Sequence, residues 1–260
     1  MLLENKVAAI FNPANKRSIA WAIAQELDAQ GAQLFLGYQN ERTKGNVEKL
    51  AEELTKPPLA LIPLDVTDDE QLANAAAVIK QSSHNLDILV HSLAFAPREC
   101  LEKPFLETSR EAFAMAMDIS AYSLTALCHS FSPLMNDGAS IMAMSYFGAE
   151  KVIPNYNVMG VAKAALEASV RYLAYDLGPR QIRVNAISAG PLNTLAARGV
   201  SGFVDMLDLY KERTPLKRGI SGEEVARTAL YLASNLSSGV TGETIYVDAG
   251  YNIMGLTEER

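Results

Sequence analysis

Apolar runs alternate with amphipathic stretches along the whole chain. Short continuous apolar runs are typical of strands that are buried on both faces of a sheet, as in parallel sheets. They predict seven strands, at residues 7–11, 33–38, 60–64, 86–92, 140–144, 182–188 and 244–247.

The intervals between these runs carry helical periodicity. It predicts helices at about residues 19–30, 41–54, 68–81, 109–131, 156–178 and 223–234, and a substrate-binding loop with short helices at about 190–215. Ser18 suits the N-cap of the first helix, and Gly31 suits its end. Strands alternating with helices predict an α/β fold, a doubly wound seven-stranded parallel sheet of the Rossmann type. No linker or repeat divides residues 1–260, so we expect a single domain.

Composition and charge narrow the class of protein. Apolar residues make up 49% of the 260 residues, and the net charge of −7 without a basic run argues against nucleic-acid binding. The N-terminus lacks a signal peptide pattern, and no apolar run is long enough for a membrane span. We therefore expect a cytoplasmic protein that binds neither membrane nor nucleic acid. The cysteines and histidines form no ligand cluster, so no metal site is predicted at Cys100, Cys128, His84, His91 or His129.

Candidate chemistry centres on residues 144–166. Pro154 favours a helix that starts near Tyr156, and on that helix Tyr156, Met159 and Lys163 share one face. In a first helical turn, two turns from an ammonium, the phenol of Tyr156 would have a lowered pKa. Such a phenol suits stabilisation of a developing oxyanion. The alternative is a buried tyrosine with a snorkelling lysine on an ordinary amphipathic helix.

Ligands of doubly wound folds bind at the carboxyl ends of the strands. After the first predicted strand there is no GxGxxG motif, and Asn12 stands there instead, a residue that tolerates left-handed backbone. Ser18 and Ile19 then open a helix whose backbone N–H groups are placed to bind a phosphate. The alternative is an ordinary strand–helix turn.

The ends of two further predicted strands indicate how a nucleotide would be bound. Asp65-Val66 follows the third predicted strand and either binds an adenine amino group or starts the next helix. The second predicted strand is followed by Gln39, and beyond it Glu41 and Arg42 offset each other in charge. An acidic residue at that strand end disfavours a 2′-phosphate and a basic one attracts it, so the sequence favours NADH over NADPH.

Several more segments join these motifs: SIAWAIA at 18–24, YQNE at 38–41, HSLAFAP at 91–97, DISAYS at 118–123, RVNAISAGPLNTLAA at 183–197 and TGETIYVDAG at 241–250. With the central stretch, they resemble the NADH-dependent enoyl-acyl-carrier-protein reductases of bacterial type II fatty acid synthesis, divergent short-chain dehydrogenases/reductases. The resemblance covers about Asn5 to Leu256. Its most specific part is the Tyr-x6-Lys spacing of Tyr156 and Lys163, because ordinary superfamily members have Tyr-x3-Lys.

The resemblance implies NADH-dependent reduction of the trans-2 double bond of an enoyl thioester. Tyr156 would hydrogen-bond the thioester carbonyl, Lys163 would hold the nicotinamide ribose, and Tyr146 would lie on the substrate side. With the phosphate turn, the expected cofactor-binding residues are Asn12, Ser18, Ile19, Gln39, Asp65, Val66, Leu93, Lys163, Leu192, Asn193, Thr194, Leu195 and Ala196. The expected substrate-binding residues are Ala96, Tyr156, Met159, Ala196, Phe203 and Met206.

The resemblance also implies an acyl carrier protein as partner and a homotetramer, which Gly160, Ala164 and Ala168 would allow by close helix approach. The loop 196–203 would close over cofactor and acyl chain. Family members usually carry glycine at four positions where this chain has Asn12, Ala22, Ala94 and Ala249. We expect these departures to affect cofactor affinity more than chemistry.

Two other functions fit the same motifs. One is an oxidoreductase of the same superfamily that acts on a different carbonyl or enoyl substrate. The other is a non-catalytic paralogue that binds an acyl group or a nucleotide. Oxidation of NADH in the presence of a crotonyl thioester distinguishes these functions from an enoyl reductase.

Overall fold

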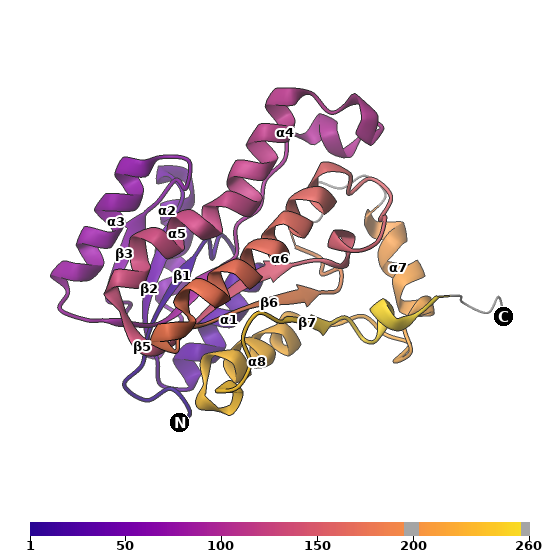
Figure 1. Cartoon of the computed structure of the whole chain (residues 1–260). Coiled ribbons are helices and arrows are strands. Elements are labelled where there is room, and N and C mark those ends of the chain that lie inside the picture. Colours follow the sequence, from indigo (N-terminus) through magenta and orange to yellow (C-terminus); the bar gives the residue numbers. More distant parts are fainter. Residues whose placement is uncertain (195–202, 256–260) are drawn as a thin grey trace.

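The computed structural model describes residues 1–194 and 203–255, apart from the side chains of residues 203–205. A single seven-stranded sheet runs through the molecule in the order β3-β2-β1-β4-β5-β6-β7, with every pair parallel (Figure 1). The strands are β1 Val7–Phe11, β2 Gln33–Tyr38, β3 Ala60–Pro63, β4 Leu86–His91, β5 Met135–Ser145, β6 Arg183–Ala189 and β7 Thr244–Val247. The predicted doubly wound parallel sheet is confirmed.

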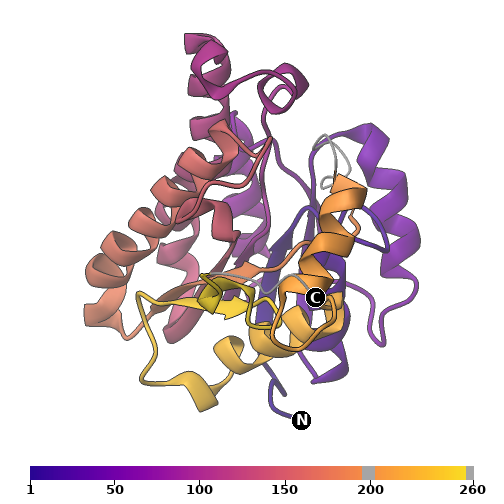
Figure 2. The same cartoon turned by 90° about the vertical axis from the view of Figure 1, so that its right-hand side faces the viewer.

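Helices cover both faces of this sheet (Figure 2). Each face has its own apolar core. One face packs against α1 Ile19–Ala29, α2 Glu41–Ala51 and α8 Gly222–Ala233. The other face packs against α3 Asp69–Gln81, α5 Ser123–Phe131 and α6 Val158–Leu177. Every residue of β1, β4 and β6 is buried, as expected for central strands of a parallel sheet covered on both faces. β1 is apolar throughout, whereas β4 and β6 also bury polar residues: Asp87, His91, Arg183, Asn185 and Ser188. The remaining helices are α4 Arg110–Met117, beside α6, and α7 Phe203–Arg213.

The helix predicted over 109–131 is interrupted. A π-helical turn, Asp118–Tyr122, separates α4 from α5. It brings the Ser120 hydroxyl against the loop after β4, where Ser120 Oγ accepts from the Phe95 N–H at 2.9 Å and lies 3.0 Å from the Phe95 carbonyl. Such turns often occur at functional sites, and this one holds a loop that borders the main cavity.

The first helix begins and ends as its sequence predicts. The Ser18 hydroxyl accepts from the Trp21 N–H, and Gly31 follows the helix with a left-handed φ of 98°. No helix within residues 1–194 and 203–255 is both long and apolar enough to cross a membrane.

Candidate active site

A cavity of about 790 Å³ opens at the carboxyl ends of five strands. One lining residue comes from the end of each strand or directly after it: Asn12, Gln39, Ser92, Ser145 and Ala189. β1 and β4 are neighbours in the sheet but are followed by helices on opposite faces, so the cavity lies at the topological switch point where doubly wound folds bind ligands.

One end of the cavity is the turn from β1 into α1. Asn12 has a left-handed φ of 67°, and its N–H donates to the Gly37 carbonyl at 3.1 Å, which ties the turn to β2. Ser18 and Ile19 line the cavity at the start of α1. The first N–H groups of a helix have no partner within it and carry the positive end of its dipole, so this end suits a phosphate.

The start of α2 forms the neighbouring wall. Asn40 and Thr43 make a capping box, with side-chain to backbone hydrogen bonds of 3.2 and 3.1 Å. Glu41 forms an ion pair with Lys44 at 3.6 Å. Arg42 lines the cavity beside Gln39, so a cation does border this end.

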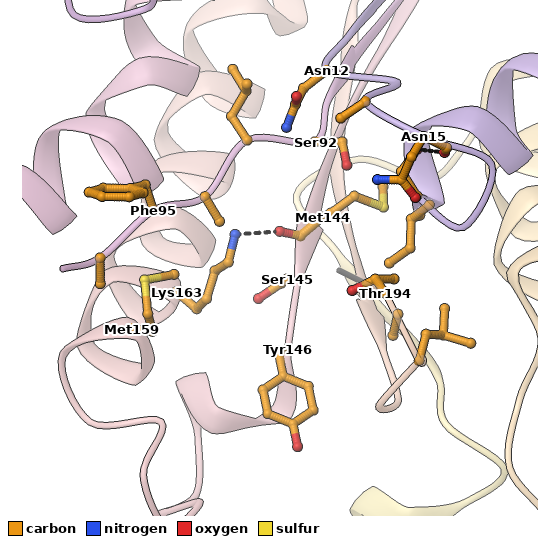
Figure 3. Close-up of a pocket in the computed structure, with 18 of the residues that line it drawn as sticks. Asn12, Asn15, Ser92, Phe95, Met144, Ser145, Tyr146, Met159, Lys163 and Thr194 are labelled. Atoms are coloured by element: carbon orange, nitrogen blue, oxygen red, sulfur yellow. Dashed lines mark hydrogen bonds between the residues drawn. The ribbon is translucent and has the colours of Figure 1, made fainter. Parts of the chain in front are cut away.

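Lys163 brings a buried cation to the centre of the cavity (Figure 3). It reaches from α6 to β5, where its Nζ donates to the Met144 carbonyl at 2.8 Å. Burial lowers the pKa of Lys163 to about 8, an effect that the Glu167 carboxylate partly opposes. The ammonium therefore titrates near physiological pH when the cavity holds no anion.

Two tyrosines border the same cavity. The rings of Tyr146 and Tyr156 meet edge to face, with centroids 4.8 Å apart. Burial raises the pKa of each phenol well above its usual value, and each also neighbours a further phenol, Tyr251 for Tyr146 and Tyr146 for Tyr156. Both phenols are therefore neutral hydrogen-bond donors at physiological pH.

The predicted lowering of the Tyr156 pKa is wrong. α6 begins at Val158, so Tyr156 lies in the turn before the helix rather than in its first turn. Desolvation disfavours the phenolate, and this effect is the largest contribution to the raised pKa.

Two glycines fix the position of the Tyr156 ring. A Cβ on Gly148 would lie 2.5 Å from Tyr156 Cδ1, and a Cβ on Gly160 would lie 2.7 Å from the Gly148 carbonyl oxygen. Position 160 therefore admits no side chain in this backbone. The sequence pattern marks Gly160 but gives no reason to select Gly148.

Two pairs of polar side chains lie near Lys163, Ser145 with Glu167 and His91 with Ser123. The Ser145 hydroxyl donates to Glu167 Oε1 at 2.5 Å, and burial raises the pKa of the Glu167 carboxyl. His91 is fully buried with its Nε2 2.7 Å from the Ser123 hydroxyl, and burial, together with Lys163, lowers its pKa to about 3. His91 is thus a neutral core residue.

The cavity brings most of the expected site residues together. Its lining includes the expected cofactor residues Asn12, Ser18, Ile19, Gln39, Leu93, Lys163, Leu192 and Thr194. It also includes the expected catalytic and substrate residues Tyr146, Ala96, Tyr156, Met159 and Met206. Their roles stay predictions.

Three described residues of the expected cofactor set are not in the cavity lining: Asp65, Val66 and Asn193. Asp65 Oδ1 instead accepts hydrogen bonds from the Thr67 N–H at 3.0 Å and from its hydroxyl at 2.7 Å, and Val66 is buried. Leu195, Ala196, residues 196–202 of the expected loop and the Phe203 side chain lie outside the described residues.

The cavity also has lining residues that no motif selected. They include Asn15, Phe95, Arg98, Leu101 and Ile153. The carboxyl-end rule points to Asn15 and Phe95, because they follow β1 and β4. Arg98, Leu101 and Ile153 reach the cavity only through tertiary packing.

The four residues that replace glycines differ in their surroundings. Asn12 and Ala249 have left-handed backbone, with φ of 67° and 54°. Ala22 lies where α1 meets α8, and its Cβ would be 3.3 Å from a Cβ built on Gly222. Ala94 lines the cavity without a left-handed backbone. Strain from the missing glycines is therefore confined to Asn12 and Ala249.

Comparison with known proteins identifies close relatives over almost the entire chain. A family model described as enoyl-(acyl carrier protein) reductase matches residues 13–252. The NADPH-dependent enoyl-acyl-carrier-protein reductase FabI of Staphylococcus aureus (strain MRSA252) is 53% identical over 250 residues, 96% of this chain and 98% of that protein. The NADH-dependent FabI of Synechocystis sp. is 50% identical over 256 residues, 98% of this chain and 99% of that protein. A crystal structure of the Bacillus cereus reductase with NADP+ and indole naphthyridinone superposes with a TM-score of 0.96, at 49% identity and covering 98% of this chain and 99% of that one.

Proposed function

The chain belongs to the enoyl-acyl-carrier-protein reductase family of oxidoreductases, and from this premise we propose that it reduces the trans-2 double bond of an enoyl thioester carried by acyl carrier protein, with NADH as its cofactor. The observation that carries the proposal is one cavity that joins a helix N-terminus, a buried ammonium and two neutral phenols. The first two suit a dinucleotide, and the phenols suit a carbonyl oxygen.

The donors present fit a dinucleotide cofactor. The N-terminus of α1, at Ser18 and Ile19, would hold the pyrophosphate, and Gln39 would face the adenosine ribose. Lys163 would hold the nicotinamide ribose hydroxyls, since its ammonium lies at the cavity centre. When bound, the nicotinamide would supply a hydride to C3 of the enoyl chain, and a proton from solvent at C2 would complete the reduction.

Tyr156 then has a defined task. Addition at C3 places negative charge on the thioester carbonyl oxygen, and the neutral phenol of Tyr156 donates a hydrogen bond to it. An aimed donor in a site without bulk water contributes ~3 kcal/mol of transition-state stabilisation. Burial raises the pKa of Tyr156, so the phenol keeps its proton and stays a hydrogen-bond donor at physiological pH.

Cofactor choice is the finer part of the proposal, because the relatives include both NADH and NADPH enzymes. Glu41 places a carboxylate beside the Gln39 end of the cavity, and its ion pair with Lys44 draws that cation away from a 2′-phosphate. Arg42 is the competing feature, as it lines the cavity. We expect a higher kcat/KM with NADH, and a higher value with NADPH would show that Arg42 reaches the phosphate.

Self-association is also part of the proposal. Large apolar side chains are exposed on α6 and the π-helical turn: Tyr122, Val161, Tyr172 and Tyr175. Tyr172 and Tyr175 are 76% and 83% exposed. Such surfaces usually mark interfaces, and we propose a homotetramer built through this face.

The decisive experiment is oxidation of NADH by the purified protein with a crotonyl thioester and, separately, with a ketone. An enoyl reductase consumes NADH only with the thioester. Turnover of the ketone instead would favour another reductase of the superfamily. NADH binding without turnover of either would favour the non-catalytic paralogue.

A further inference from the structure

The backbone on both sides of Tyr156 is unusual. Asn155 has φ of 65°, and Asn157 has φ of 43° with ψ of −119°. Non-glycine residues in such conformations cost of order 1–3 kcal/mol each and persist only where the surroundings hold them. The surroundings of Asn157 show what holds it.

The amide of Asn157 joins the Tyr156 turn to the segment of the cavity wall at residues 98–103. Its Nδ2 donates to the Cys100 carbonyl at 3.0 Å and to the Lys103 carbonyl at 2.9 Å. These carbonyls belong to the 3₁₀ turn Arg98–Leu101 and the residues directly after it. Arg98 and Leu101 line the cavity, so a single side chain connects this wall to the residue next to Tyr156.

A small apolar core supports the same connection. Val158, which follows Asn157, packs with Cys100, Ala112 and Ala116, apart from the two large cores on the sheet. Ala96, at the cavity, is partly buried against this cluster. Figure 1 shows α4, which carries Ala112 and Ala116, running beside α6. The start of α6 is thus held by residues that also shape the cavity wall.

We propose that Asn157 is a positioning residue for Tyr156, and that it fixes the phenol relative to the Arg98–Leu101 wall. Both amide protons of Asn157 are used, so neither a smaller nor an acidic residue reproduces the connection. The inference rests on the proposed function, in which the Tyr156 hydroxyl meets the thioester carbonyl.

Asn157→Gly tests the connection without adding strain, because glycine adopts this backbone at no steric cost. We expect kcat with the crotonyl thioester to fall by about 10- to 100-fold, since small misplacements of an aligned group cost rate on this scale. The KM for NADH should stay within about twofold, because Lys163 is held separately by Met144. Asn157→Asp, which keeps the volume but sets a carboxylate against two carbonyls, should show the same loss. Asn5→Gly is the matched control, because Asn5 is also left-handed, with φ of 64°, and is remote from the cavity lining.

A double-mutant cycle separates positioning from general destabilisation. In a Tyr156→Phe background, Asn157→Gly should lower kcat no further, because the hydroxyl on which it acts is already absent. Equal losses in both backgrounds, or kcat of Asn157→Gly within twofold of the parent, would overturn the inference. A parent without enoyl reductase activity would instead refute the proposed function. NADH titration of each variant establishes that it is folded.

Discussion

At the scale of single residues, Tyr156 illustrates how environment decides chemistry. A tyrosine and a lysine at this spacing suggest a phenol that ionises easily, yet burial beside a second phenol has the opposite effect. Tyr156 is therefore suited to donate a hydrogen bond rather than to exist as phenolate. Donating this hydrogen bond requires the Tyr156 hydroxyl in its neutral form.

Replacing that hydroxyl gives a direct prediction. Tyr156→Phe should lower kcat about 100-fold, the cost of losing one oxyanion donor, while the Kd for NADH stays nearly unchanged. Steady-state kinetics and fluorescence titration of NADH measure the two quantities. Tyr175→Phe, at an exposed position, is the control. Full turnover by Tyr156→Phe would transfer the role to Tyr146 or to solvent.

Lys163 predicts a pH dependence of cofactor binding. Its pKa in the free protein is lowered to about 8, so the ammonium is present below that pH and is lost as the pH rises through it. NADH, an anion, should bind most tightly below pH 8 and more weakly above it. Lys163→Ala should bind NADH more weakly throughout and without this dependence. Calorimetric titration with NADH at pH values below and above 8 measures this dependence. An unchanged affinity for NADH in Lys163→Ala would refute the ribose contact.

Substitutions of Asn12 test how well the chain tolerates a residue other than glycine at this left-handed position. A left-handed residue other than glycine costs about 1–2 kcal/mol, and asparagine is among the least penalised. Asn12→Ala should therefore lower the free energy of unfolding by about 1 kcal/mol, whereas Asn12→Gly should leave it nearly unchanged or raise it. NADH affinity of Asn12→Gly should rise by no more than about tenfold, the equivalent of ~1.4 kcal/mol. Urea denaturation and NADH titration test both effects, and absence of NADH binding by the parent at millimolar cofactor would contradict the catalytic function.

At the scale of elements, the contact between α6 and the 3₁₀ turn Phe147–Ala149 (η5) sets the position of the Tyr156 ring. The two elements meet at Gly148 and Gly160, with no room for a Cβ on either residue. The turn continues β5, so the contact joins the end of the sheet to the helix that carries Lys163.

Gly148→Ala is expected to push the Tyr156 ring out of place. Overpacking of this kind costs about 1–3 kcal/mol in the free energy of unfolding, and kcat should fall because the phenol moves. Gly45→Ala is the matched control, since a Cβ at Gly45 in α2 meets nothing within 4 Å. That control should gain about 0.5–1 kcal/mol of stability and keep full activity. Parental stability and kcat in Gly148→Ala would show that the ring adapts.

At the scale of the whole molecule, α6 takes part in two features: the cavity at the switch point of the sheet, and an exposed surface that carries Tyr172 and Tyr175. α6 contributes Lys163 to the cavity from its buried face and Tyr172 and Tyr175 to the surface. A second subunit on this surface would support α6 from outside. Catalytic geometry and assembly would then be linked through one helix.

The assembly prediction is tested by removing the exposed rings. The double variant Tyr172→Ser with Tyr175→Ser should shift the mass in solution from a tetramer towards dimers or monomers, because it removes apolar area from the proposed interface. Size-exclusion chromatography with light scattering at micromolar protein measures this. Lys80→Ser, at an exposed position on α3, is the control. A parent that is monomeric at these concentrations would contradict the proposal.

Much of the fold is encoded locally in the sequence. Most strands are short and mainly apolar, and Ser18 and Gly31 mark the ends of α1 through interactions within a few residues. The carboxyl ends of the strands then locate the cavity, because parallel strands place these ends on one edge. By itself the sequence thus determined the parallel sheet, the strand positions and the region of the site.

The tertiary structure decided what depends on contacts between distant segments. The neutral state of Tyr156 follows from burial, the Gly148–Gly160 contact from the packing of α6 on η5, and the Asn157 connection from carbonyls more than fifty residues away. The break of the long helix at Asp118–Tyr122 likewise places Ser120 against Phe95. None of these features has a local pattern, because each is set by the partner that the fold supplies.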